Sequence, residues 1–254
     1  MLQAKNDQTR EFYADRATDV AKLDDRMRRV VAACASLHPR SIIDIGCGRG
    51  FLLQQLLARD PSLTAYGVEL SSMLAREARA AGIDVFEQNV EAGIPLPDNS
   101  IDVAVLGEVI EHVFDPDACV EEMRRILRPG GTLIVTTPNL ASWLNRLLVL
   151  FGVQPVFTET STRKKYGHWL AALGQGKSTT QGHLKLFTLG ALREMLDDLG
   201  FDVVSAEGHK CYMLEDHPVA NVVESVFRVK PSLASGFVVM ARKRETPAAT
   251  PGPR

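Results

Sequence analysis

The stretch DIGCGRG, residues 44–50, decides the fold of this 254-residue chain. Its glycines follow an apolar run at 42–45 and precede a segment with helical spacing that begins near Phe51. Glycines between a strand and a helix let the backbone approach a ligand and direct helix N–H groups toward it. A dinucleotide-binding turn spaces its glycines as G-x-G-x-x-G, and a Walker-type phosphate loop continues into Gly-Lys-Ser or Gly-Lys-Thr. Neither pattern occurs here, so the turn favours a nucleoside ligand without a pyrophosphate.

Outward from this turn, short apolar runs alternate with amphipathic segments. We expect strands at 63–68, 83–86, 101–107, 132–136, 201–207 and 235–241, and helices beginning near residues 51, 72, 116 and 189. Near-continuous apolar strands separated by helices predict an α/β fold with a mostly parallel sheet and helices on both faces. Ligands bind such sheets at the carboxyl ends of the strands. Glu69 stands at such an end, about 20 residues past the glycines, where a carboxylate can accept both ribose hydroxyls of an adenosine.

The ordered set of segments resembles class I S-adenosylmethionine-dependent methyltransferases, and is similar to ubiquinone-biosynthesis-type O-methyltransferases. The glycine turn and Glu69 resemble motifs I and II of that family. Later segments also match, namely EQNV at 87–90, IPLPDNSIDV at 94–103, LRPGGTL at 127–133, HLKLFT at 183–188 and LGF at 199–201. The resemblance covers roughly 36–139 and 183–242. It implies a Rossmann-like fold with a seven-stranded sheet, and S-adenosylmethionine as cofactor.

The same resemblance implies which residues contact the cofactor. They belong to the glycine turn, to the ends of the next three strands and to an aromatic lid at the N-terminus: Asp44, Gly46, Cys47, Gly48, Glu69, Leu70, Asn89, Val90, Gly107, Glu108 and Tyr13. Asn89 departs from the family, which often has an aspartate there. An amide oxygen can accept the same hydrogen bond from the adenine amino group.

The segment EVIEH at 108–112 places Glu108, Glu111 and His112 at i, i+3 and i+4, so the three share one face if the segment is helical. It resembles the metal-binding segment of small-RNA 2′-O-methyltransferases. That resemblance implies a divalent metal site completed by a later histidine, His183, with His168 as the reserve. Mixed oxygen and nitrogen ligands suit Mn²⁺, Fe²⁺, Co²⁺ or Zn²⁺, and such an ion lowers the pKa of a bound hydroxyl.

Two interpretations without metal stay open for the same segment. In the first, His112 is the catalytic general base, with Glu111 beside it, because neutral imidazole is the usual proton acceptor near pH 7. In the second, Glu111 and His112 cap a helix or contact the methionine end of the cofactor.

The chain divides into an N-terminal helical lid at 1–35, a methyltransferase domain at 36–244 and a proline-rich disordered tail at 245–254. Residues 139–182 interrupt the alternation, and the resemblance makes them a substrate-cap insert. Around this insert, basic residues outnumber the single acid Glu159: Arg163, Lys164, Lys165, Lys177 and Lys185. This balance favours an anionic acceptor, and a solvated loop is the alternative. The apolar run 144–153 is too short to span a bilayer but can touch its surface.

Composition and charge exclude several classes of function. The chain has 29 Lys+Arg and 31 Asp+Glu, a formal net charge of -2, which disfavours nucleic acid as a partner. Its four cysteines lack C-x-x-C spacing, so no disulfide framework or zinc site is readable. The first 13 residues lack the apolar core of a secretory signal, and we expect a cytoplasmic protein.

The expected function is therefore enzymatic: O-methylation of a hydroxyl on a small-molecule or lipid-like metabolite. A metal-dependent RNA 2′-O-methyltransferase is the second candidate. A non-catalytic partner protein that keeps the cofactor fold is an alternative of another class, and the intact glycine turn with Glu69 argues against it. The sequence leaves the oligomeric state open.

Overall fold

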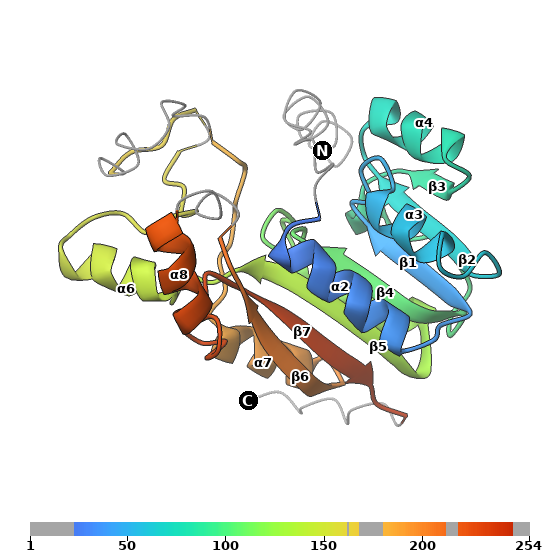
Figure 1. Ribbon diagram of the computed structural model, residues 1–254. Coiled ribbons are helices and arrows are strands. Elements are labelled where there is room, and N and C mark those ends of the chain that lie inside the picture. The colour runs from blue at the N-terminus through green and yellow to red at the C-terminus, as the bar shows by residue number, and fades with distance from the viewer. Residues whose placement is uncertain (1–22, 162, 168–179, 212–217, 246–254) are drawn as a thin grey trace, which may run out of the picture.

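The computed structural model describes residues 23–161, 163–167, 180–211 and 218–245. Seven strands form one sheet in the order β3-β2-β1-β4-β5-β7-β6 (Figure 1). The strands are β1 Ser41–Ile45, β2 Thr64–Glu69, β3 Asp84–Glu87, β4 Ile101–Gly107, β5 Leu127–Pro138, β6 Phe201–His209 and β7 Gly236–Lys243. Strands β1 to β5 run parallel, and β7 lies antiparallel between β5 and β6. The expected mostly parallel seven-stranded sheet is confirmed.

Helices cover both faces of the sheet. They are α2 Asp25–Ser36, α3 Phe51–Leu57, α4 Ser72–Ala80, α5 Pro116–Ile126, α6 Trp143–Leu150, α7 Leu189–Asp198 and α8 Pro218–Phe227, with a short 3-10 helix at Val90–Ala92. Neighbouring residues of β1 point to opposite faces, as the pleat requires. Ile42 packs in an apolar cluster with α2 and α3, whereas Ile43 packs in a second cluster with α5 and α7. The central strands are therefore buried on both sides, which explains their continuous apolar runs.

Polar residues start the helices where the sequence changes from strand to helix spacing. The side chains of Asp24, Ser71, Asp115, Ser142 and Thr188 each accept a hydrogen bond from a backbone N–H in the first turn of α2, α4, α5, α6 and α7. Helix α3 begins differently, at Gly50 in the left-handed conformation with a φ of +76°. The functional end of β1 thus leads into a helix whose first N–H groups no side chain caps.

The structure shows two local features that the sequence left open or did not indicate. The segment 108–113 is a turn rather than a helix, because the N–H of His112 bonds the carbonyl of Val109 and no helix continues from it. Helix α8 was not expected at all. Its one charged residue, Glu224, is buried, so the segment lacks the polar face by which a surface helix is recognised. The residues at 1–22 and 246–254, most of the expected lid and tail, lie outside the described ranges.

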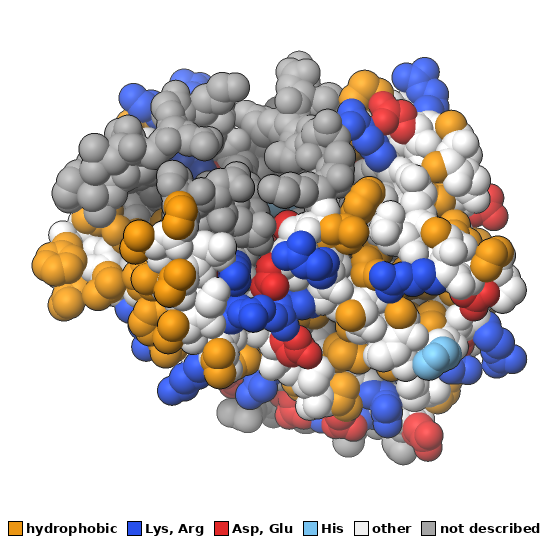
Figure 2. Space-filling model, in the orientation of Figure 1, with side chains coloured by type: hydrophobic (Ala, Val, Ile, Leu, Met, Phe, Trp, Pro, Cys, Tyr) orange, Lys and Arg blue, Asp and Glu red, His pale blue; other side chains and the backbone are white. Residues whose placement is uncertain are grey.

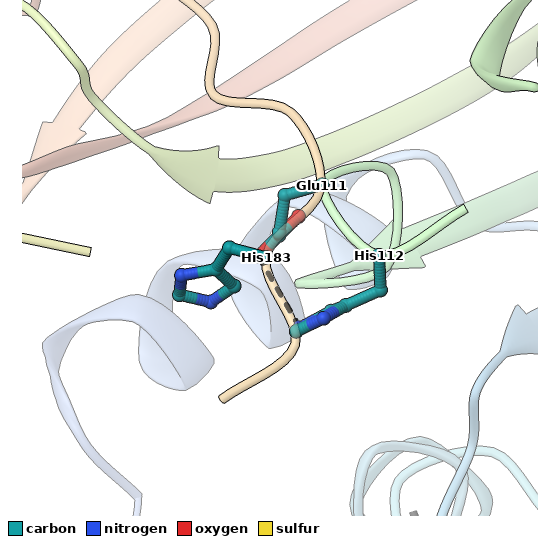
Figure 3. A group of neighbouring side chains, drawn as sticks. All are labelled: Glu111, His112 and His183. Carbon is teal, nitrogen blue, oxygen red and sulfur yellow. Dashed lines mark ion pairs between the residues drawn. The ribbon is translucent and has the colours of Figure 1, made fainter. Parts of the chain in front are cut away.

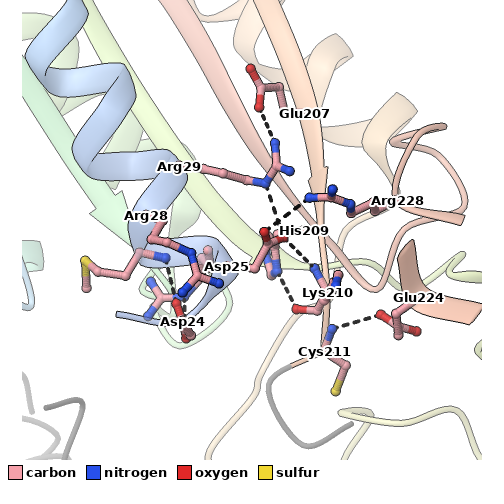
Figure 4. A network of polar contacts seen from close by, with 12 residues as sticks. Asp24, Asp25, Arg28, Arg29, Glu207, His209, Lys210, Cys211, Glu224 and Arg228 are labelled. Atoms are coloured by element: carbon pink, nitrogen blue, oxygen red, sulfur yellow. Dashed lines mark hydrogen bonds and ion pairs between the residues drawn. The ribbon is translucent and has the colours of Figure 1, made fainter. Parts of the chain in front are cut away.

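After β5 the chain builds a side unit from α6 and α8. The Trp143 ring stacks on Phe227 with ring centroids 5.1 Å apart, and its Nε1–H donates to Glu224 at 2.6 Å. A polar network holds this unit to the sheet (Figure 4). In it, Asp25 of α2 accepts from Arg228 just past α8, and Glu224 accepts from the N–H of Cys211. No helix among the described residues has the length and apolar character needed to cross a membrane.

Candidate functional site

The glycine turn after β1 combines two tightly packed glycines, Gly46 and Gly50, with one that borders open space, Gly48. Gly46, Gly48 and Gly50 all have positive φ values, between +55° and +76°. A Cβ at Gly50 would lie 2.1 Å from Cδ1 of Ile83, so this glycine serves packing. A Cβ at Gly48 would meet nothing within 4 Å. The backbone at Gly48 can therefore approach a ligand closely, as the sequence predicts.

Glu69 joins this turn to the end of β2. Its Oε2 accepts from the Gly48 N–H at 2.9 Å, and its Oε1 accepts from the Ser71 N–H at 2.7 Å. The carboxylate is buried, with 9% of the residue exposed. Each carboxylate oxygen can accept a further bond. Glu69 is thus fixed beside Gly48 with acceptor capacity left for a pair of hydroxyls.

Asp44 on β1 is buried and lies within the electrostatic influence of Arg26 on α2, whose Nε stands 4.0 Å from Oδ2 of Asp24. Burial, opposed by the Arg26 guanidinium and assisted by the nearby Glu69, raises the pKa of Asp44 to about 7. Nη1 of Arg26 lies 3.7 Å from where a Cβ on Gly107 would stand, at the end of β4. The sequence does not indicate Arg26 as a site residue, because it is one of three arginines in the same helix turn and nothing in the pattern singles it out. The structure places its positive charge at the carboxyl end of the sheet.

The other expected cofactor residues follow the ends of the strands. Cys47 lies buried in the glycine turn, Leu70 directly follows β2, and Val90 opens the 3-10 helix after β3. Asn89 caps that 3-10 helix, since its Oδ1 accepts from the Glu91 N–H at 3.1 Å. One more lone pair on this oxygen can take an amino donor. Tyr13 and His168 lie outside the described residues.

Glu108 and Glu111 point in different directions because the segment between them is a turn. Glu108 has a φ of +57°, and its Oε1 accepts from Oγ1 of Thr136 on β5 at 2.9 Å. Glu111 is fully buried, and its Oε2 accepts from Oγ1 of Thr137 at 3.0 Å. The two carboxylates therefore bond successive residues of β5. The single face expected of a helix does not form.

Glu111, His112 and His183 come together in one group (Figure 3). One ligand atom from each, a carboxylate oxygen or ring nitrogens, lies within 4.8 Å of the other two. The imidazole rings of His112 and His183 stand with centroids 4.8 Å apart, and Oε1 of Glu111 lies 4.0 Å from Nε2 of His112. Glu108 is not a member of this group. The structure thus brings three of the four residues that the resemblance implies, Glu111, His112 and His183, close to one another.

Both imidazoles are held in the same tautomer by backbone carbonyls. Nδ1 of His112 lies 3.1 Å from the Gly182 carbonyl oxygen, and Nδ1 of His183 lies 2.8 Å from that of Phe157. A carbonyl only accepts, so Nδ1 carries the proton and Nε2 keeps its lone pair. Burial, with His183 adding to it, lowers the pKa of His112 to about 4, and burial also lowers the pKa of His183. Both rings are neutral at pH 7.

Glu111 contributes a buried oxygen that lacks a partner. Its Oε1 has no hydrogen-bond donor among the residues that the structure describes. Burial raises the pKa of Glu111 well above its ordinary value, and the charge of Glu108 raises it further. An unpaired buried acceptor costs about 1–3 kcal/mol. A proton or a cation at this oxygen would remove that cost, so one carboxylate and two neutral imidazoles fit a divalent transition metal by their chemistry.

Residues of the insert and the residue Leu184 just after it form hydrogen bonds around this group. The Leu184 N–H donates to the Glu111 carbonyl at 2.8 Å, and the Glu159 carboxylate accepts from the Gly182 N–H at 2.8 Å. Of the basic residues in this region, Lys165 has its Nζ 3.7 Å from Oε1 of Glu159, and Lys185 donates a hydrogen bond from its Nζ to the carbonyl of Phe114. Arg163 and Lys164 are exposed, and Lys177 lies outside the described residues. The insert therefore fixes His112 and His183 through its backbone.

Comparisons with known proteins identify the family to which the chain is similar. A family profile described as a methyltransferase domain matches residues 16–206. A Mycolicibacterium smegmatis protein, named as a probable S-adenosylmethionine-dependent methyltransferase, is 36% identical over 114 residues, which cover 44% of this chain and 42% of that protein. A ubiquinone biosynthesis O-methyltransferase of Xanthomonas oryzae is 32% identical over 115 residues, covering 43% of this chain and 47% of the relative. The match spans less than half the length of either relative.

A solved structure with a similar fold is the 1,6-didemethyltoxoflavin-N1-methyltransferase of Burkholderia thailandensis, with a TM-score of 0.59 and 17% identity over 95% of this chain and 89% of that one. At this identity the likeness concerns the fold alone. The family profile, by contrast, matches a range that contains the glycine turn, Glu69 and strands β1 to β5. On these grounds the chain belongs to the methyltransferase domain family of class I S-adenosylmethionine-dependent methyltransferases.

Proposed function

We propose that this protein transfers the methyl group of S-adenosylmethionine to a hydroxyl of a small-molecule or lipid-like acceptor. The observation that carries the proposal is the group of Glu111, His112 and His183 beside the glycine turn. A Cβ on Gly46 would lie 2.8 Å from Cγ2 of Val109, so the turn at 108–113 touches the glycine turn. Proton-accepting groups thus stand next to the place where the cofactor is expected.

Positioning supplies most of the rate in this proposal. The sulfonium already carries an activated methyl group, and the protein has to hold the acceptor oxygen in line with the breaking S–C bond. Well-oriented intramolecular reactions recover about 7–11 kcal/mol, and a general base adds about 10² to 10⁴-fold. His112 is the base in the metal-free form of the mechanism, because its neutral Nε2 accepts the proton that the hydroxyl loses. Glu111 stands beside it.

Metal binding at the same residues is the second form of the mechanism. Glu111, His112 and His183 would hold a divalent ion. Glu108 lies near enough to act electrostatically on both histidines. Such an ion supplies positive charge that lowers the pKa of the acceptor hydroxyl. The unpartnered Oε1 of Glu111 supports this form. The Nε2 lone pair of His112 cannot bind an ion and accept a proton at once, so the two forms exclude each other.

The cofactor itself is assigned to the turn and the strand ends. Gly48 offers open backbone, Glu69 accepts the ribose hydroxyls and Asn89 accepts from the adenine amino group. Arg26 joins them as a cation for the cofactor carboxylate, since it lies at the end of β4 beside Gly107. The remaining cofactor contacts in this proposal are those that the family resemblance implies: Asp44, Gly46, Cys47, Leu70, Val90, Gly107, Glu108 and Tyr13.

Methyl transfer from radiolabelled S-adenosylmethionine into a cell extract tests the reaction. The extract is separated afterwards into lipid, small-molecule, protein and RNA pools. We expect label in the lipid or small-molecule pool, with an anionic product if Arg163 and Lys164 contact the acceptor. Label in RNA would instead establish the 2′-O-methyltransferase alternative. Absence of label together with no binding of S-adenosylhomocysteine would indicate a non-catalytic partner protein.

Three variants separate the two forms of the mechanism. His112→Asn should lower kcat by about 10² to 10⁴-fold, while the matched control His38→Asn, at an exposed surface histidine, should leave it unchanged. Glu111→Gln and His183→Asn should abolish Mn²⁺ uptake in equilibrium dialysis and any chelator-sensitive activity. All should keep their affinity for S-adenosylhomocysteine. Full activity in a chelator with no metal uptake would reject the metal form and leave His112 as the base.

A further inference from the structure

Helices α6 and α8 expose eight large apolar side chains, which we call the apolar patch (Figure 2). Four belong to α6 and the residue after it, and four to α8 and the chain just past it. Their residues are 46–81% exposed: Leu147, Val149, Leu150, Phe151, Val219, Val222, Val226 and Val229. Monomeric domains rarely expose apolar side chains in such a cluster unless it binds a partner or a membrane.

The eight side chains form one surface because the two helices pack through their opposite sides. Trp143 of α6 stacks on Phe227 of α8 and donates to the buried Glu224. On α8 the valines recur at i, i+3, i+7 and i+10, a single face of the helix. In the space-filling view the apolar side chains gather over α6 and α8 (Figure 2).

The charge around the apolar patch has one sign. In the described parts of 143–167 and 218–233, the acidic residues are Glu159 and Glu224. Both are buried, with 4% of the Glu159 side chain and 1% of Glu224 exposed. The exposed charged residues of these ranges are all basic: Arg146, Arg163, Lys164 and Lys230. Among the described residues of these ranges, the unit therefore presents apolar and positively charged groups together, without an exposed negative charge.

We propose that α6 and α8 dock on the surface of an anionic lipid bilayer. The apolar patch enters the boundary between headgroups and acyl chains, and the exposed cations contact lipid phosphates. The helices are 8 and 10 residues long, so they lie in the interface and do not cross it. A second copy of the chain fits this surface less well, because a two-fold contact would bring the same cations against each other.

Docking would occur beside the candidate site. The chain runs from α6 to Phe157, whose carbonyl accepts from Nδ1 of His183. The insert thus links the apolar patch to the group formed by Glu111, His112 and His183. Delivery of a lipid-like acceptor from the bilayer rests on the proposed function, but docking itself does not.

Sedimentation of the full chain with vesicles tests the proposal. Vesicles of phosphatidylcholine alone are compared with vesicles that contain phosphatidylglycerol as well. We expect clear binding to the anionic vesicles, weaker binding to phosphatidylcholine, and a loss of binding as salt screens the cations. Absence of binding to the anionic vesicles would overturn the proposal.

Paired variants locate the contact. Two double variants are compared with the wild type: Leu150→Ser with Phe151→Ser, and Val222→Ser with Val226→Ser. Each should weaken vesicle binding about tenfold or more, since each removes two apolar side chains that the bilayer would bury. Val204→Ser is the matched control, because Val204 is 50% exposed on β6 outside the apolar patch. It should bind as the wild type does. Equal binding by all variants would contradict docking through α6 and α8.

Two further readouts keep the outcomes distinct. Affinity for S-adenosylhomocysteine should be unchanged in every variant, which shows that the cofactor fold is intact. Analytical ultracentrifugation detects the competing occupant: a dimer that both paired variants dissociate, without vesicle binding, would replace the bilayer by a second copy. Neither readout requires methyl transfer, so failure of docking and failure of the proposed function are separate results.

Discussion

Gly46 packs against Val109, so the turn that follows β1 and the turn that follows β4 are in direct contact. A Cβ added at Gly46 would lie 2.8 Å from Cγ2 of Val109, closer than such atoms approach in proteins. Val109 stands between Glu108 and the Glu111–His112 pair. The cofactor turn and the candidate catalytic turn are therefore coupled through a single side chain.

This contact predicts the behaviour of Gly46→Ala. The new Cβ costs about 1–2 kcal/mol for the left-handed backbone, and the clash with Val109 displaces the catalytic turn as well. We expect losses of stability, of S-adenosylhomocysteine affinity and of activity. Gly82→Ala is the control, because its φ is +84° but a Cβ there meets nothing within 4 Å. The double variant with Val109→Ala should recover part of the affinity, and the absence of recovery would refute the coupling.

Glu69→Gln should weaken the binding of S-adenosylhomocysteine by about ten- to a hundredfold. The amide keeps one acceptor oxygen but replaces the other with a donor, which faces the N–H of Gly48 or Ser71. Isothermal titration calorimetry measures the change. Glu77→Gln, at an exposed surface pair with Arg49, should bind as the wild type does. Equal affinity in Glu69→Gln and wild type would remove Glu69 from the cofactor site.

Arg26→Met should also weaken cofactor binding, through a different group. Arg26 is the cation beside Gly107 at the end of β4, and its charge lowers the pKa of Asp44. Loss of a charge-assisted bond to a ligand carboxylate costs about 1.5–3 kcal/mol, which is about ten- to a hundredfold in affinity. Adenosine, which has no carboxylate, should bind Arg26→Met and wild type equally. An equal loss for both ligands would indicate a structural role for Arg26 instead.

Asp44 predicts a change of stability with pH. Its pKa is about 7 in the folded protein and near 3.8 when exposed, so the folded state retains a proton between those values that the unfolded state has lost. This contribution to stability is complete below about pH 4 and is lost as pH rises to about 7. Asp44→Asn has no such proton, so its stability relative to wild type should increase over that interval. Urea unfolding at several pH values measures the difference, and a constant difference would contradict the burial of a neutral Asp44.

Local pattern was sufficient for most of the sheet. The apolar run at 101–107 became β4 with the same bounds, and the predicted starts of α3, α4 and α5 match the structure. These elements have strong periodicity and polar caps such as Ser71 and Asp115, which act within a few residues. Helix α8 was missed because its one charged residue is buried and accepts hydrogen bonds from Trp143, Cys211 and Ser235, which all lie outside the helix.

For the candidate site, the sequence by its spacing pointed to the glycine turn and to Glu69 at the end of a predicted strand, and its resemblance to known methyltransferases pointed to Glu111, His112 and His183. Only the tertiary structure decided that Glu108 turns toward Thr136 while Glu111 joins the two histidines. It also brings Arg26 beside Gly107, and the carbonyls of Phe157 and Gly182 to the Nδ1 atoms that set the imidazole tautomers. The residue types and their spacing show which chemical groups a chain contains. The distances between those groups, and the burial that sets their protonation, arise only when separate segments of the chain pack together.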